Sequence, residues 1–221
     1  MFVKNNRNKK SFLVIGVGRF GGSFARNLHR LGCEVVAVDE DLDKIHQISE
    51  QVTEAITGNI HSEEFLGSLG LENFDAVMVA IGQDVKSSIL ISTMVKELGA
   101  KYVLSKANDD LHEKILKKIG VDWVITVEKE MGRKVALSLF SNKIIDSIDI
   151  TPDFRLVELL VPAEWIGKRV ADISLFKRHQ LMLTVIKRQG AVIAQPQPET
   201  TFQEEDIAVV CGAIGEIAKI S

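Results

Sequence analysis

Residues 11–142 alternate between short apolar runs and stretches in which apolar residues recur with helical spacing. In one such stretch Ile91, Met94, Val95 and Leu98 are three and four positions apart, as they are on one face of a helix. The predicted strands are Phe12–Ile15, Val35–Val38, Glu54–Thr57, Ala76–Ile81, Tyr102–Leu104 and Trp123–Val127. Strands that alternate with helices predict an α/β fold, a doubly wound, mostly parallel sheet of Rossmann type.

The last third of the chain has a different pattern. A predicted helix at Glu130–Ser141 is followed by Asp149–Asp153, which has the composition of a turn-rich joint, and a short helix is predicted at Val170–Arg178. The strand-like segments are Leu156–Val161, Met182–Lys187, Ala191–Ala194 and Ile207–Cys211. We therefore expect two domains, residues 1–145 and 146–221. The second is a small α+β module, and we expect it to dimerise because it is close to the lower size limit of an independent domain.

The turn after the first predicted strand carries the strongest chemical signal. Residues 16–21 have the sequence Gly-Val-Gly-Arg-Phe-Gly and open a helix. In such a turn Gly16 permits the sharp bend, Gly18 lets the backbone approach a phosphate, and Gly21 lets the helix pack against the strand. The helix N-terminus offers N–H groups and partial positive charge to the phosphate. The segment predicts a nucleotide site.

An acid follows at the end of the next predicted strand. Asp39 is 18 residues beyond Gly21, where a carboxylate can accept both hydroxyls of an adenosine ribose. A carboxylate also repels a 2′-phosphate, which disfavours NADP. NAD, ATP, ADP and AMP all remain compatible with this position.

Composition and charge exclude several classes of protein. The chain has 221 residues, of which 46% are apolar and 26% charged, as in a soluble globular protein. A net charge of −3 gives no reason to expect nucleic-acid binding. No apolar run approaches the length of a membrane-spanning helix, and the start lacks the pattern of a signal peptide. We expect a cytoplasmic protein.

Several segments together resemble a known family. They are Val14–Gly22, Val38–Asp39, Gly58–Asn59, Val79–Gly82 and Glu128–Gly132, with Gly190, Pro196, Pro198 and Glu204–Asp206 in the tail. In this order and spacing the chain resembles the RCK proteins, which regulate potassium conductance, and most of all the cytosolic subunits of Ktr/Trk-type bacterial potassium uptake systems. The resemblance implies a regulatory subunit, not an enzyme, that gates a membrane potassium-translocating partner.

The resemblance also implies an assembly and its ligands. Relatives form a homo-octamer, a tetramer of dimers, that is peripheral on the inner face of the cell membrane. ATP and ADP bind the first domain and change the shape of the ring, with NAD as a further candidate ligand and a divalent cation near the phosphates. In relatives the dimer interface of the second domain can hold a cyclic dinucleotide, which suggests cyclic di-AMP here. A comparable cleft would use Arg178, His179, Pro196 and Pro198; the alternative is an interface that only dimerises.

Individual nucleotide-site residues follow from matching the motifs. Arg19 is implied to reach the terminal phosphate of a nucleotide held by the dimer neighbour, and Glu128 to bind the metal ion. Asn59 replaces an aspartate found in many relatives, and its amide can still form a hydrogen bond to the ligand. The full predicted set is Gly16, Val17, Gly18, Arg19, Phe20, Gly21, Asp39, Glu40, Asn59, Ile60, Ala80, Ile81, Gly82, Lys106 and Glu128.

Two other functions are less compatible with the sequence than a regulatory sensor. A small NAD-dependent oxidoreductase would need a substrate-facing acid or base, and the tail offers no plausible one. A transcription factor would need a basic helix-turn-helix, which the pattern lacks. Tyr102 and Lys106 have the spacing of a short-chain dehydrogenase pair, but that pair requires a helix and this segment is a predicted strand. The histidines show no metal spacing, and most are expected to be solvated helix residues: His29, His46, His61, His112 and His179.

Overall fold

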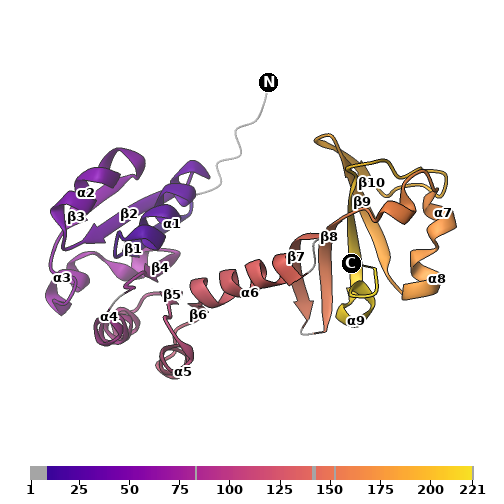
Figure 1. Ribbon diagram of the computed structural model, residues 1–221. Coiled ribbons are helices and arrows are strands. Elements are labelled where there is room, and N and C mark those ends of the chain that lie inside the picture. The colour runs from indigo at the N-terminus through magenta and orange to yellow at the C-terminus, as the bar shows by residue number, and fades with distance from the viewer. Residues whose placement is uncertain (1–8, 83, 141–142, 152, 221) are drawn as a thin grey trace. The chain divides into compact units, whose positions relative to one another are not determined.

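The computed structural model describes residues 9–82, 84–140, 143–151 and 153–220 (Figure 1). The chain divides into two compact units, Met1–Lys129 and Glu130–Ser221. This division falls inside helix α6 (Val127–Phe140), upstream of the domain boundary that the sequence placed at residue 145. Within the described residues, no helix has both the length and the apolar composition needed to cross a bilayer.

The first unit contains the parallel six-stranded sheet that the sequence predicts, and its strand order is β3-β2-β1-β4-β5-β6. The strands are β1 (Ser11–Ile15), β2 (Glu34–Asp39), β3 (Glu54–Thr57), β4 (Ala76–Val79), β5 (Val103–Lys106) and β6 (Trp123–Ile125). The helices that connect them are α1 (Arg19–Arg30), α2 (Leu42–Ile48), α3 (Glu63–Ser68), α4 (Val85–Glu97) and α5 (Asp110–Lys118), with 3-10 turns at Ser49–Gln51 and Leu71–Asn73.

Both faces of this sheet are buried, which explains the continuous apolar runs. Leu13 and Ile15 of β1 belong to one core cluster, and Val14 between them belongs to a second cluster. Successive side chains of a strand point to opposite faces, so the two clusters lie on the two sides of the sheet. The strand order reverses at β1, which pairs with both β2 and β4. In open α/β sheets ligands bind at the carboxyl ends of the strands beside such a reversal.

The second unit contains an antiparallel five-stranded sheet in the order β10-β9-β11-β8-β7. Its strands are β7 (Ile144–Thr151), β8 (Phe154–Leu160), β9 (Met182–Arg188), β10 (Ala191–Ala194) and β11 (Ile207–Ala213). Short helices α7 (Val170–Ile173), α8 (Leu175–His179) and α9 (Ile214–Ile217) and a 3-10 turn at Ala163–Trp165 complete it. Its core is a separate cluster that includes Leu159, Leu181, Ile186 and Phe202, each at most 1% exposed.

Two predictions for the tail were wrong. The turn-rich joint at Asp149–Asp153 is in part the end of β7, a strand that the sequence analysis missed and that pairs with β8. The single helix expected at Val170–Arg178 is two helices, because Ser174 between them has a left-handed backbone with φ of 52°. Pro152 of the joint and Ser141, the expected end of α6, lie outside the described residues.

Candidate functional site

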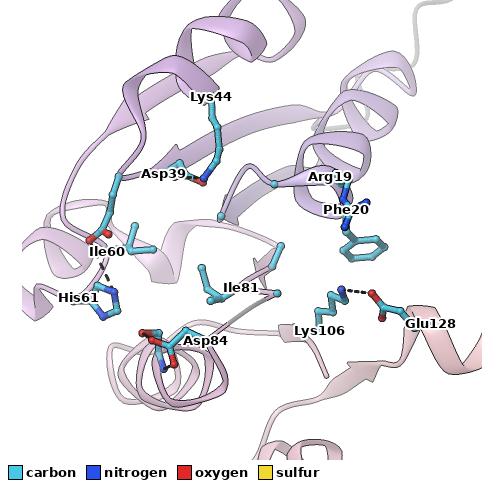
Figure 2. A pocket seen from close by; sticks show the side chains of 16 residues that line it. Arg19, Phe20, Asp39, Lys44, Ile60, His61, Ile81, Asp84, Lys106 and Glu128 are labelled. Carbon is cyan, nitrogen blue, oxygen red and sulfur yellow. Dashed lines mark hydrogen bonds and ion pairs between the residues drawn. The ribbon is translucent and has the colours of Figure 1, made fainter. Parts of the chain in front are cut away.

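A cavity of about 790 Å³ opens at the carboxyl edge of the parallel sheet (Figure 2). Its volume is in the range of small-molecule and cofactor sites. The lining residues are Gly16, Gly18, Arg19, Phe20, Asp39, Glu40, Lys44, Ile60, His61, Ala80, Ile81, Gly82, Asp84, Ser87, Lys106 and Glu128. They come from the carboxyl ends of β2 and β5, from the loops and first helical turns that follow β1, β2, β3 and β4, and from the start of α6, so the cavity lies at the strand reversal.

The glycine turn has two crowded positions and one open position. Gly16 has φ of +95°, and a Cβ there would lie 2.9 Å from Ile81 Cδ1. A Cβ on Gly21 would lie 1.9 Å from the carbonyl oxygen of Gly16, where α1 packs against the turn. A Cβ on Gly18 would meet no atom within 4 Å, and this residue lines the cavity. Gly16 and Gly21 are therefore required by packing, and Gly18 leaves backbone accessible to a ligand.

The N-terminus of α1 has no side-chain cap. Helices α2, α3, α4 and α5 are each capped by an acceptor side chain, that of Asp41, Ser62, Asp84 or Asp109. The N-cap residue of α1 is Gly18, and the first turn contains no acid. The first N–H groups of a helix lack intrahelical acceptors and carry partial positive charge. This helix end is therefore suited to an anion such as a phosphate.

The carboxylate of Asp39 holds the glycine turn against the end of β2. Asp39 is 7% exposed, and its Oδ2 accepts the backbone N–H of Val17 at 2.7 Å. Its Oδ1 accepts the backbone N–H of Asp41 at 2.9 Å and lies 3.3 Å from Lys44 Nζ. Burial opposes the charge on Lys44, but the carboxylates of Asp39 and Asp41 outweigh it and raise the pKa of Lys44. The turn is thus shaped before any ligand binds.

A lysine and an acid form an ion pair at another part of the cavity. Lys106, the last residue of β5, is 9% exposed, and its Nζ donates to Glu128 Oε1 at 2.7 Å. This hydrogen bond holds the pKa of Glu128 below its usual range. The positive charges of Lys106 and Arg19 also lower the pKa, whereas burial opposes the shift. Figure 2 shows Arg19 and Phe20 above this pair. Arg19 and Lys106 make this part of the cavity attractive to an anion.

The remaining wall combines apolar and polar side chains. Ile60 and Ile81 supply apolar surface, and Glu40 Oε1 lies 4.0 Å from His61 Nε2. Asp84 caps α4 and accepts the Ser87 hydroxyl at 2.6 Å, a hydrogen bond that, with those from backbone N–H groups, lowers the pKa of Asp84. This mixture suits a heterocycle with a polar rim.

The cavity contains most of the predicted nucleotide-site residues. Three predicted residues do not line it. Val17 is buried and contributes its N–H to Asp39, Gly21 packs beneath the turn, and Asn59 Oδ1 accepts the backbone N–H of His61 at 2.9 Å. Four further residues that the sequence motifs did not indicate also line the cavity: Lys44, His61, Asp84 and Ser87. Their position shortly after the ends of β2, β3 and β4 is the signal that was available.

Tyr102, Lys106 and the histidines lie in settings that do not favour catalysis or metal binding. Tyr102 immediately precedes β5 and Lys106 ends it, so the dehydrogenase-like spacing lies on extended chain, as expected. Most histidines were expected to be solvated; His112 is an exception, since it is 1% exposed on α5 and burial lowers its pKa. Within the described residues, no group of three His, Cys, Asp or Glu side chains is placed to hold a metal ion.

Three of the four residues predicted for a second effector line two cavities of the second unit. Arg178 and His179 line one of about 320 Å³ together with Trp165 and Lys168. Pro198 lines another of about 530 Å³ beside α7 and α8, and Pro196 lines neither of the two. One chain therefore does not bring all four predicted residues into one of these cavities.

The fold and the cavity define the chain as a nucleotide-binding α/β unit followed by a small α+β unit. Comparison with family models finds the same two parts. Residues 12–127 match the TrkA-N domain and residues 155–221 match the TrkA-C domain. The chain belongs to the TrkA-type RCK family, which includes the Ktr system potassium uptake proteins. The resemblance found in the sequence is confirmed.

Three curated relatives are similar along nearly their whole length. Ktr system potassium uptake protein C of Bacillus subtilis (strain 168) is 36% identical, over 96% of both chains. Protein A of the same system and strain is 38% identical, over 92% of this chain and 91% of the relative. Protein A of Vibrio alginolyticus is 34% identical, over 95% of both.

Solved structures share the fold at low sequence identity. The crystal structure of the GsuK RCK domain matches 96% of this chain with a TM-score of 0.69 at 16% identity. The GsuK channel bound to NAD matches 97% with a TM-score of 0.69 at 17% identity. The present chain spans 47% of the first of those chains and 39% of the second. A GsuK structure bound to ADP matches 57% of this chain with a TM-score of 0.50 at 16% identity.

Proposed function

We propose that this chain is the cytosolic regulatory subunit of a potassium uptake system, and that it senses adenine nucleotides to gate a membrane potassium-translocating partner. The relatives at 34–38% identity are named as subunits of such a system. The observation that carries the sensing role is the cavity in which the uncapped N-terminus of α1 lies beside the buried carboxylate of Asp39.

The cavity has a complementary group for each part of an adenine nucleotide. Asp39, Ile60 and Ile81 all line the cavity. We assign Asp39 to the ribose and the apolar surface of Ile60 and Ile81 to the base. The backbone N–H groups after Gly18 and the cations of Arg19 and Lys106 suit the phosphates. NAD and ADP, which are bound in GsuK structures, share this adenosine diphosphate core. ATP and ADP are the ligands proposed to change the shape of the ring.

A divalent cation fits the same region through Glu128. Magnesium in nucleotide sites is commonly held by one or two carboxylates together with substrate phosphates and water. Glu128 is a hard oxygen donor beside the proposed phosphate position, and it now binds Lys106 at 2.7 Å. When bound, the cation would neutralise phosphate charge. Lys106 and Glu128 would then separate, with Lys106 free to contact the phosphates.

We further propose that eight chains, as four dimers, form a ring that is peripheral on the inner face of the membrane.

A second effector, cyclic di-AMP, is proposed to bind at the dimer interface of the second unit. The basic side chains of Lys168 and Arg178 support this ligand, because their N–H groups can donate hydrogen bonds to phosphates, although Glu164 and Asp172 line the same cavity. Equilibrium dialysis of the full chain with cyclic di-AMP tests it, and the absence of saturable binding would remove the second effector.

Calorimetric titration of the purified full chain with ADP, ATP and NAD tests the sensing role. Saturable binding of at least ADP and ATP is expected, and no binding at millimolar concentration would contradict it. Potassium flux through the partner in vesicles, measured with and without the chain and each nucleotide, tests gating. The alternative of a small NAD-dependent oxidoreductase predicts instead that NADH is oxidised with simple carbonyl substrates.

A further inference from the structure

Asp39 is already well supplied with hydrogen-bond donors from its own chain. A carboxylate oxygen has two lone-pair sites. Within the described residues, Oδ1 receives the Asp41 N–H and the Lys44 ammonium, at 2.9 Å and 3.3 Å, and Oδ2 receives the Val17 N–H at 2.7 Å. One site, on Oδ2, is left for a ligand. A ribose offers two hydroxyl donors, so Asp39 by itself does not account for both.

Lys44 supplies the complementary group. Its ammonium has three N–H donors. It lies 3.3 Å from Asp39 Oδ1 and 3.5 Å from Asp41 Oδ2, and these contacts leave one donor without an acceptor in the described part of the chain. The side chain is 43% exposed and lines the cavity. Figure 2 shows it extending from α2 to the carboxylate of Asp39.

We propose that Lys44 and Asp39 together recognise the ribose hydroxyls, so that Lys44 determines the selectivity of the site for ribonucleotides. A hydroxyl can donate to Asp39 Oδ2 and accept from Lys44 Nζ at the same time. A deoxyribose carbon can do neither. A 2′-phosphate can accept from Lys44 but cannot donate to Asp39, and its charge meets Asp39, Glu40 and Asp41. This inference rests on the proposed binding of adenine nucleotides and specifies how their sugar is recognised.

A lysine that only balances the charge of Asp39 and Asp41 makes a different prediction. Partly exposed ion pairs contribute little to stability, and their loss affects any anionic ligand in the same way. A direct contact with the ribose affects only ligands that carry the hydroxyls. The two roles of Lys44, charge balance and direct contact with the ribose, are therefore separated by comparing a ligand that has the hydroxyls with one that lacks them.

The test is calorimetric titration of the full chain with ADP and with 2′,3′-dideoxy-ADP. The variants are Lys44→Met, Lys44→Arg and, as a control with the same charge change, Lys86→Met on the exposed start of α4. We expect Lys44→Met to weaken the binding of ADP by about tenfold, the effect of one hydrogen bond to a charged group. The affinity for dideoxy-ADP should stay within about twofold of its wild-type value. Lys44→Arg should keep most of the preference for ADP, and Lys86→Met should keep all of it.

Two outcomes overturn the inference while leaving the proposed function intact. One is an equal loss of affinity for ADP and dideoxy-ADP in Lys44→Met, which would assign Lys44 a general electrostatic role. The other is an affinity for ADP that Lys44→Met leaves unchanged. If the wild-type chain binds neither nucleotide, the proposed function fails first and the inference fails with it. Unchanged thermal unfolding of the variants confirms that folding is not the cause of a loss.

Discussion

We propose that Arg19 is the side chain that distinguishes ATP from ADP. The two nucleotides share their adenine, ribose and first two phosphates, so Asp39 and the glycine turn contact the same groups in both. A ligand shifts a conformational equilibrium only through its different affinity for the two states. The distinction must therefore arise at the terminal phosphate, and Arg19 is an exposed guanidinium on the rim of the cavity.

We predict that Arg19→Ala weakens ATP by about tenfold or more, since a charge-assisted hydrogen bond contributes about 1.5–3 kcal/mol. ADP should be affected much less, and the difference between the effects of ATP and ADP on partner flux should disappear. Asp39→Ala serves as the control and should weaken both nucleotides equally. Calorimetric titration measures each affinity, and equal losses of ATP and ADP in Arg19→Ala would show that another group makes the distinction.

Asp206 makes the stability of the second unit dependent on pH. It is fully buried and accepts Arg188 Nε and Nη2, each at 2.8 Å, and the Gln203 N–H at 2.8 Å. Burial raises the pKa of Asp206, but the bonds from Arg188 and Gln203 outweigh it and bring the pKa below 3.8. A carboxylate with a depressed pKa in the folded state stabilises the fold above its unfolded pKa. That contribution is lost as the pH falls through the folded pKa.

Asp206→Asn should therefore lower the free energy of unfolding at pH 7 by about 3 kcal/mol, the effect of removing one partner of a buried ion pair. The difference from wild type should shrink as the pH falls below about 4, where the wild-type carboxyl begins to be protonated in the unfolded chain. Urea unfolding of the variant and the wild type at pH 7 and at a pH below about 4 measures this difference in the free energy of unfolding. Glu204→Gln, at an exposed position two residues away, should change little. A difference that grows in acid would contradict the assigned ion pair.

At the scale of elements, two adjacent glycines of α1 differ in whether the structure has room for a side chain. A Cβ on Gly21 would lie 1.9 Å from the Gly16 carbonyl oxygen, whereas on Gly22 its nearest neighbour would be Arg26 Nη1 at 3.4 Å. Gly21→Ala must therefore push α1 away from the turn, which should cost about 1–3 kcal/mol of stability and most of the nucleotide affinity. Gly22→Ala should be neutral or gain up to about 1 kcal/mol. Thermal unfolding and ADP titration compare the variants, and a well-folded Gly21→Ala with wild-type affinity would refute the packing argument.

The elements that sequence predicts well are those buried on both sides. The strands of the parallel sheet appear as continuous apolar runs because helices cover both faces. β7 escaped detection because it is an outer strand in which Asp146, Ser147 and Asp149 interrupt the apolar residues. The helix break at Ser174 arises because this residue has a left-handed backbone. Serine has no special preference for that conformation, so the spacing of apolar residues does not predict the break.

Prediction of the site was limited in a similar way. The glycine turn and Asp39 are close in sequence and have a recognisable spacing, so they were found. Lys44, His61 and Ser87 belong to loops and helices after other strands, and only the parallel arrangement of β2, β3 and β4 brings them to one cavity. The partnership of Asp39 with the Val17 N–H and Lys44 is a property of the folded chain.

At the scale of the whole molecule, the proposed ring predicts a definite mass. Eight chains of 24.5 kDa make a particle of about 196 kDa. Light scattering on the purified protein should give this mass at micromolar concentration, with or without nucleotide, because nucleotides are proposed to change the shape and not the number of subunits. Dilution should pass through a dimer before a monomer. A monomer at micromolar concentration would eliminate the ring.

β7 and β10 are the outer strands of the second unit, and this has a consequence for how the protein behaves in concentrated solution. An outer strand presents unpaired backbone groups on which other chains can add and aggregate. β7 is the longer of the two and exposes Ile148 and Ile150, but its Asp146 and Asp149 form ion pairs with Lys134 and Arg133 of α6. Those cations lower the pKa of both acids, so the charges persist in mild acid. Charged side chains on an outer strand hinder amyloid-like addition. The same pairs that join α6 to the sheet thus help to keep the protein dispersed.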